Sequence, residues 1–137
     1  MGLWHAKQLG IDSAGLARLD LPRDAATLVA HRITVLDAEN RRLLGVGAVL
    51  GNRFDPDLVA AVGSVHRQRV ADALADAVWQ RLMEATGDGS YRFLHHGIRE
   101  VLLDLFDPAH LRALHDRAAA QAVTFLERAA ETAAAAG

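Results

Sequence analysis

Hydrophobic residues recur at helical spacing along most of the chain after residue 22. A first helix is predicted from Asp24, a possible N-cap, and from a stripe made of Leu28, Val29, Ile33 and Leu36. Asp37 can cap a second helix, in which residues 43–50 are nearly all apolar. Because this helix would be apolar on nearly all of its faces, we expect it to be central and buried. Gly51 is expected to end it.

The next two predicted helices are short and then long, with a glycine between them. Asp55 and Pro56 mark the start of the short one, because proline is favoured at the first helical position. It ends near Gly63, and Ser64 is placed to cap the longer helix. The inward face of that longer helix is predicted to be Val70, Leu74, Ala77, Val78 and Leu82. A short helix, a turn and a longer helix form the helix-turn-helix pattern.

Two short strand candidates follow, at residues 82–85 and 90–93, around the turn sequence TGDG. Asp-Gly between two such runs favours a β-hairpin. A fifth helix is predicted from the spacing of apolar residues in 98–105, and Asp107-Pro108 separates it from a last helix. The pattern therefore predicts a mainly α fold: a winged helix-turn-helix, with helices plus a two-stranded wing, followed by a C-terminal helical arm.

The chain divides into three predicted parts. Residues 1–22 are weakly periodic and interrupted by glycine and proline, which indicates a loop or tail. Residues 23–106 form the winged-helix domain, and residues 107–137 form the C-terminal helix. One core is expected to gather ten side chains from five segments: Val46, Val49, Leu50, Phe54, Leu58, Leu74, Val78, Phe93, Ile98 and Leu102.

Composition narrows the functional classes. The 137 residues suffice for one domain with a core, and a net charge of −2 argues against a dominant nucleic-acid surface. The sequence contains no cysteine, so disulfides and thiolate zinc sites are excluded. It has neither an apolar run of about 18 residues nor a signal-type N-terminus, so we expect a cytoplasmic protein, or a piece of one, without membrane contact.

A pair of adjacent histidines, His95 and His96, lies between the second strand and the fifth helix. His96 and Glu100 are four residues apart and would share a helix face, as metal ligands require. Zinc normally takes at least three protein ligands, and the nearest other histidines, His110 and His115, belong to another helix. The sequence therefore predicts no metal site.

Other signals of catalysis are weak. The run GVGAVLG at residues 45–51 resembles a phosphate loop, but it lacks a preceding strand and the Gly-Lys-Ser/Thr ending. Close helix packing explains those glycines better. No serine lies in a GxSxG elbow. We therefore predict that the chain is not an enzyme.

A DNA-binding function is the main alternative. The start of the second helix of a helix-turn-helix reads base edges, and His66, Arg67, Gln68 and Arg69 stand there. Acidic residues on the same helix and before it oppose this interpretation and favour a solvated face of mixed charge. Arg99 and Glu100 are also expected to be solvated.

Four short motifs carry a resemblance to a known family. They are Arg32-Ile33 with Leu36, Ala48–Gly51 with Phe54-Asp55, Tyr91–Glu100, and Leu114-His115 with Ala118-Ala119. Together they resemble the winged-helix region that follows the nucleotide-binding core in STAND-class, AAA-related signal-transduction ATPases. The resemblance spans about residues 22–120. Such ATPases occur in large LuxR-like transcription regulators and in cyclase- or kinase-linked proteins.

The resemblance gives His95 a role. Its position matches a histidine that approaches the diphosphate of bound ADP and helps to hold the inactive form, and His96 matches the aspartate beside that histidine. A donor at a helix N-terminus suits an anion. The other interpretation is that His95 caps or packs at this junction in an isolated domain.

The ATPase core itself is absent, because no Walker A lysine motif and no Walker B acid are present. The resemblance implies that residues 1–22 are the connector from a helical lid. It also implies a non-catalytic regulatory and protein-interaction module with no cofactor of its own, since ADP or ATP would bind only in a parent protein. The expected partners are the nucleotide-binding core and helical domains of that parent, or other proteins.

One departure from the family pattern concerns Gly97, which stands where leucine is common. Glycine costs a helix about 1 kcal/mol relative to alanine. We therefore expect the fifth helix to begin later or to bend at this residue.

Overall fold

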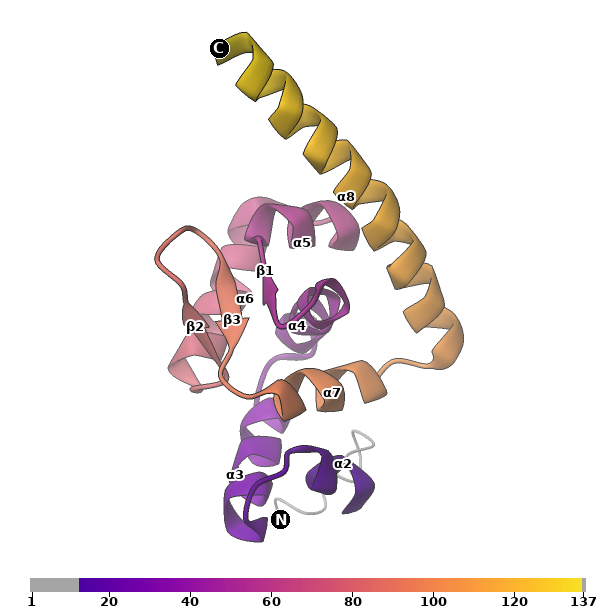
Figure 1. The fold of residues 1–137 in the computed structure, drawn as a ribbon. Coiled ribbons are helices and arrows are strands. Elements are labelled where there is room, and N and C mark those ends of the chain that lie inside the picture. The colour runs from indigo at the N-terminus through magenta and orange to yellow at the C-terminus, as the bar shows by residue number, and fades with distance from the viewer. Residues whose placement is uncertain (1–12, 137) are drawn as a thin grey trace.

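A computed structural model describes residues 13–136, which form a mainly helical fold with a small antiparallel sheet (Figure 1). In chain order the elements are α2 (Ser13–Arg18), α3 (Arg23–Thr34), α4 (Ala38–Leu50), β1 (Arg53–Phe54), α5 (Pro56–Gly63), α6 (Arg67–Trp79), β2 (Met83–Ala85), β3 (Tyr91–Phe93), α7 (His96–Asp104) and α8 (Pro108–Ala136). Residues 1–12, which include most of the predicted connector, lie outside the described residues.

The first part of the chain is more ordered than its weak periodicity predicts. Residues 13–18 form helix α2, so the prediction of a loop is wrong for this segment. Helix α3 begins at Arg23, directly after Pro22, and no side chain caps it. Asp24 is therefore not the N-cap but lies within the first turn. Its carboxylate still stabilises the helix there through the interaction with the helix dipole.

Helix α5 starts as predicted. Asp55 is its N-cap, with Oδ1 accepting a hydrogen bond of 2.8 Å from the Asp57 backbone N–H, and Pro56 occupies the first helical position. Ser64 has a different role from the predicted one, because it ends α5 in the left-handed conformation with φ of 55°. The N-cap of α6 is instead His66.

The sheet has the order β1-β3-β2, and all its pairs are antiparallel. The predicted hairpin of β2 and β3 is confirmed, with Met83 opposite Phe93 and Ala85 opposite Tyr91. The third strand, β1, was not predicted, since two residues are too few to show an alternating pattern. It pairs Phe54 with Tyr91 and so connects the start of α5 to the hairpin.

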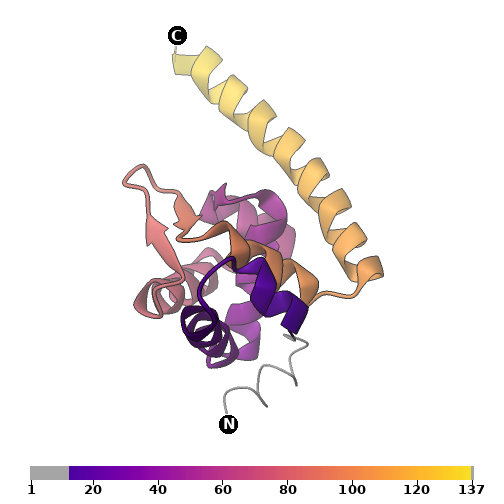
Figure 2. The same cartoon turned by 60° about the horizontal axis from the view of Figure 1, so that its bottom comes forward.

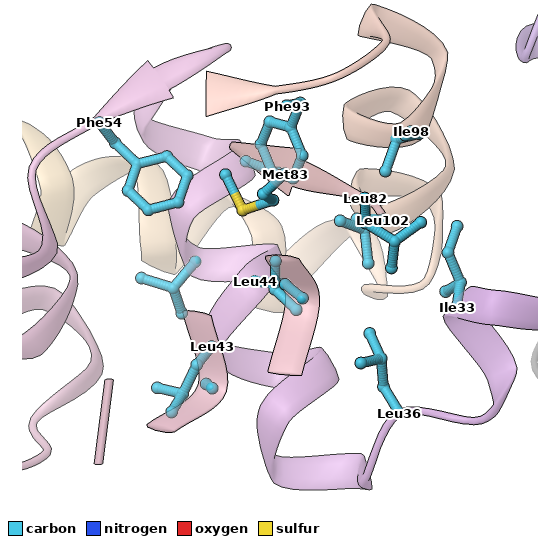
Figure 3. Packing of buried hydrophobic residues seen from close by; sticks show 14 of the residues in the cluster. Ile33, Leu36, Leu43, Leu44, Phe54, Leu82, Met83, Phe93, Ile98 and Leu102 are labelled. Carbon is cyan, nitrogen blue, oxygen red and sulfur yellow. The ribbon is translucent and has the colours of Figure 1, made fainter. Parts of the chain in front are cut away.

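The core lies between the helices and the inner face of this sheet (Figure 3). Most of the predicted core residues are buried, and Leu50 and Leu58 are partly buried against them. The prediction that Val78 belongs to the core is wrong, because 39% of this residue is exposed. The buried face of α6 consists of Val70, Ala73, Leu74 and Ala77. Leu82 is fully buried, but it follows α6 instead of belonging to it.

The glycines of α4 serve close packing, as predicted. A methyl group added to Gly45 would lie 2.5 Å from Cζ of Phe106, and one added to Gly47 would lie 2.5 Å from Cζ of Phe54. Both glycines are buried. Aromatic rings from strand β1 and from the connection between α7 and α8 therefore reach the backbone of α4 because no side chain intervenes.

The buried side chains described on the long helix α8 all lie in its first half. Leu114 and Ala118 are buried there against α4 and α5, and Arg117 donates a hydrogen bond to the hydroxyl of Ser64. The second half extends away from the other elements in both views (Figures 1 and 2). Val123 and Leu126 on this half are 56% and 71% exposed.

Candidate functional site

The junction between β3 and α7 contains the histidine pair. His95 has an extended backbone and caps α7, with its Nδ1 accepting a hydrogen bond of 3.0 Å from the Gly97 N–H. An imidazole that accepts at Nδ1 and is neutral carries its proton on Nε2. The capping interpretation of His95 is therefore observed, and the ring still has an Nε2–H donor for another group.

His96 lies directly against this ring. The two imidazole centroids are 4.7 Å apart and the rings are nearly parallel, at 21°. His95 is half-buried and His96 is exposed. Among residues 13–136, no three histidine, aspartate or glutamate side chains gather in a way that could hold a metal ion.

The neighbours of Gly97 explain why a glycine is needed at this position. A methyl group there would lie 2.5 Å from Cα of Leu19 and 2.6 Å from the carbonyl oxygen of Arg18. The backbone that follows α2 therefore rests on the first turn of α7. The expectation that the helix begins later is wrong, because α7 begins at His96 and Gly97 is its second residue. Close approach of two backbones requires the glycine.

Two further contacts hold this junction together. Arg18 forms an ion pair with Asp104 at the far end of α7, with Nε and Oδ2 2.8 Å apart. Arg99 donates through Nε to the Ala48 carbonyl at 2.7 Å, so it caps the last turn of α4. Arg99 is half-buried, and the prediction that it is solvated is wrong. Its capping role depends on the packing of α7 against α4, which no local pattern reveals.

The four candidate DNA-contact residues lie together at the start of α6, and each of them has at least one partner within the fold. Nδ1 of His66 accepts from the Gln68 N–H at 3.2 Å. Gln68 in turn donates to Asp72 at 3.1 Å, and Arg67 pairs with Asp57 of α5 at 2.9 Å. This surface is a mixture of opposite charges, as the acidic neighbours in the sequence indicated.

Arg69 belongs to a network that joins α6 to α4. Its guanidinium donates to Oδ1 of Asn40 at 2.6 Å, and the Asn40 amide donates to Asp76 at 3.0 Å. Asp37 lies 3.7 Å from the same guanidinium. Arg69 therefore orients α6 on α4, a role that the sequence alone did not suggest.

The start of α4 contains the charged groups whose pKa values shift. The hydrogen bond from Arg42 lowers the pKa of Glu39, and the same bond raises the pKa of Arg42. Burial lowers the pKa of Arg41, whose guanidinium donates to the Leu36 carbonyl at 2.8 Å. Arg41 and Arg42 also line a small depression of about 160 Å³ with Leu102, Leu105 and Phe106, whereas Glu39 does not line it.

The two candidate regions lie at opposite ends of α6. The Leu94 N–H, next to His95, donates to the Leu82 carbonyl at 3.1 Å, and Leu82 follows the C-terminal end of α6. His66 caps the other end of this helix. The structure therefore does not combine the candidate phosphate contact and the candidate DNA contacts into one site.

Comparison of the chain with models of protein families, with curated proteins and with solved structures finds no match. Within residues 13–136, no helix has both the length and the apolar character needed to cross a membrane. Any function must therefore be argued from the residues and their arrangement.

Proposed function

We propose that the chain is a winged-helix regulatory and protein-interaction module of a STAND-type signalling ATPase, and that it has no catalysis of its own. The order of elements from α4 to β3 supports this proposal. A helix, a short strand, two helices and a hairpin follow one another, and the short strand pairs with the hairpin. In the proposed module, α5 and α6 are the helix-turn-helix and the β2–β3 hairpin is the wing.

The observation that carries the proposal is the contact of Leu19 and Arg18 with Gly97. Because this contact has no room for even a methyl group, the segment entering the domain is fixed beside His95. In a parent protein, a nucleotide-binding domain joined ahead of this chain would therefore be linked to the winged-helix domain at the side where His95 lies. Arg18, through Asp104, further fixes the direction of that approach.

The chemistry of His95 suits the diphosphate of ADP. Its Nδ1 is occupied by the Gly97 N–H, so the neutral ring offers Nε2–H, and a phosphate oxygen is a strong acceptor. The location at the first turn of α7 adds the favourable end of a helix dipole. His95 would thus favour an ADP-bound state of the parent without forming a nucleotide site by itself.

Calorimetry of ADP binding to a full-length parent, with and without substitutions, tests the proposal. His95→Ala should weaken ADP binding by about 10-fold, the value of one hydrogen bond to a charged group, and should raise basal signalling. His96→Ala is the matched control, since it removes the adjacent ring but leaves the cap, and it should change the affinity less. Equal ADP affinity in the wild type and in His95→Ala would reduce His95 to a helix cap.

A second measurement separates this function from DNA binding. Because the polar groups of His66, Arg67, Gln68 and Arg69 have internal partners, we expect the chain to bind duplex DNA weakly and without sequence preference. Binding would be followed by fluorescence anisotropy at physiological salt. Sequence-selective binding that is lost in Arg67→Ala would contradict the proposed module and favour a DNA-binding regulator.

A further inference from the structure

The C-terminal end of α6 presents an unusual pair of exposed side chains. Trp79, the last residue of the helix, is 83% exposed, and Val78 beside it is 39% exposed. Together with Ala75 and Arg81, these residues line an open depression of about 390 Å³. A tryptophan that exposes most of its apolar surface loses the stabilisation that burial would give, and here Val78 extends the exposed apolar surface beside it.

Arg81 is held in a conformation that does not suit its side chain. Its φ is 58°, in the left-handed region. The turn is a Schellman motif, in which the Arg81 N–H donates to the Val78 carbonyl and the Leu82 N–H donates to the Ala77 carbonyl, both at 3.0 Å. Glycine is the usual residue at this position because any Cβ is unfavourable there. At position 81, glycine would therefore give a more stable turn than arginine does.

The guanidinium of Arg81 also lacks an internal partner. Among the described residues it makes no ion pair and no hydrogen bond, in contrast to the guanidinium groups of Arg67 and Arg69 on α6. Nearby, the bond between the Leu94 N–H and the Leu82 carbonyl brings Leu94, which is 48% exposed, to the same end of the fold. An unpaired cation and exposed apolar side chains therefore occur together.

We infer that Val78, Trp79, Arg81 and Leu94 form a docking surface for a segment of another protein that presents a carboxylate between aliphatic or aromatic side chains. The carboxylate complements Arg81, and the apolar side chains cover Trp79 and Val78. Tryptophan and arginine are the residue types that contribute most binding free energy at protein interfaces. This surface deepens the protein-interaction part of the proposed function but requires no nucleotide and no participation of His95.

The test begins with a displayed library of short random peptides selected on the purified full chain. The expected peptides contain aspartate or glutamate flanked by leucine, phenylalanine or similar residues. Trp79→Ala and Arg81→Glu should each weaken the binding of a selected peptide by about 30-fold, as expected for central interface residues. The matched controls on α8, Leu126→Ala and Arg112→Glu, should leave the affinity unchanged because both positions are exposed and α8 lies on the other side of the fold from α6 (Figures 1 and 2).

Two variants distinguish recognition from an effect on folding. Arg81→Gly should raise the melting temperature by about 3 °C, because it relieves the turn, and yet should weaken peptide binding. A peptide in which lysine replaces the selected acidic residue should recover binding to Arg81→Glu. Recovery by this charge exchange requires direct contact between the two positions.

The contrary outcomes are equally specific. Peptides that lack acidic residues, or whose binding is unchanged by Trp79→Ala, would overturn the inference. Sedimentation equilibrium that shows a dimer dissociated by Trp79→Ala would assign the surface to a second copy of the chain. Binding of duplex DNA or of anionic vesicles that depends on Arg81 would assign it to a polyanion. Failure of ADP binding in a parent to respond to His95→Ala would affect only the proposed nucleotide role.

Discussion

Helices α6 and α7 begin in the same way and have different surroundings. Each has a histidine N-cap whose Nδ1 accepts the N–H of the residue two positions later, Gln68 in one case and Gly97 in the other. Around the start of α6, charged side chains pair with one another and remain largely exposed. Around the start of α7, a segment distant in sequence rests on the helix backbone. The same local motif thus forms a solvated surface in one helix and a junction in the other.

This difference shows that histidine at an N-cap is not itself a sign of ligand binding. What distinguishes His95 is the contact beside it, where Gly97 lets the backbone of Leu19 approach. At α6 the equivalent position is Gln68, which is exposed. Substitutions at equivalent positions of the two helices can therefore separate the contribution of the cap from that of the junction.

The largest difference is expected for alanine at the second position of each helix. Gly97→Ala places a methyl group against backbone atoms that cannot move aside, so the free energy of unfolding should fall by about 2 kcal/mol, despite a better helix propensity. Gln68→Ala, the matched control, should change it by less than about 0.5 kcal/mol. Urea unfolding measures both. A Gly97→Ala protein as stable as the wild type would show that α2 does not rest on α7.

The next effect concerns the network that holds the start of α6. Asn40→Ala removes a hydrogen bond to Arg69 and another to Asp76, and we expect a loss of about 1.5 kcal/mol in urea unfolding. Arg67→Ala should cost only about 0.3 kcal/mol, because the Arg67 side chain is 76% exposed and its pair with Asp57 is screened by water. Equal losses in the two variants would contradict a structural role for the network.

The two caps themselves should differ by a smaller amount. His95→Ala is expected to cost about 1 kcal/mol and His66→Ala about 0.5 kcal/mol, since the first cap is shorter and half-buried. His95→Asn should retain most of the stability because asparagine is a good N-cap. Chemical denaturation of the four proteins measures these values. A larger loss in His66→Ala than in His95→Ala would reverse the proposed order.

The smallest effect is a pH dependence at the start of α4. The hydrogen bond from Arg42 lowers the pKa of Glu39, and the charge of Arg69 contributes. A lowered pKa in the folded protein stabilises it above the unfolded pKa, about 4.3, and this stabilisation is lost as the pH falls through the folded pKa. Glu39→Gln should therefore remove a few tenths of a kcal/mol at pH 7 and less at pH 2.5. Thermal melts at the two pH values test this, and an equal loss at both would indicate lost packing instead.

The sequence predicted the parts of the fold that depend on local signals. Asp55-Pro56 specifies the start of α5 through a cap and a fixed φ, and Asp88-Gly89 lies in the turn of the hairpin. The apolar run in α4 identified the central helix. Each of these features is determined within a few residues, so a pattern in the chain is sufficient to find it.

Features that depend on distant contacts could not be predicted in the same way. β1 is a strand only because Arg53 and Phe54 pair with the hairpin. Val78 lies one residue beyond the buried face of α6, a rotation of about 100° that periodicity in a short helix does not resolve. His66 caps α6 because Ser64 is needed to end α5. The candidate site shows the same limit. The sequence indicates His95 as a candidate, but it does not reveal that the distant residue Leu19 packs beside it.

The long helix α8 has a mechanical consequence. Ala118 is the last buried side chain described on this helix, and 18 residues follow it, from Ala119 to Ala136. At 1.5 Å per residue this part is about 27 Å long. It can act as a rigid lever whose fulcrum is the buried contact of Ala118. A tilt of about 10° at that fulcrum would move the far end by about 5 Å over a 27 Å arm, so small adjustments in the packing of α4 and α5 would become large displacements at the C-terminal end.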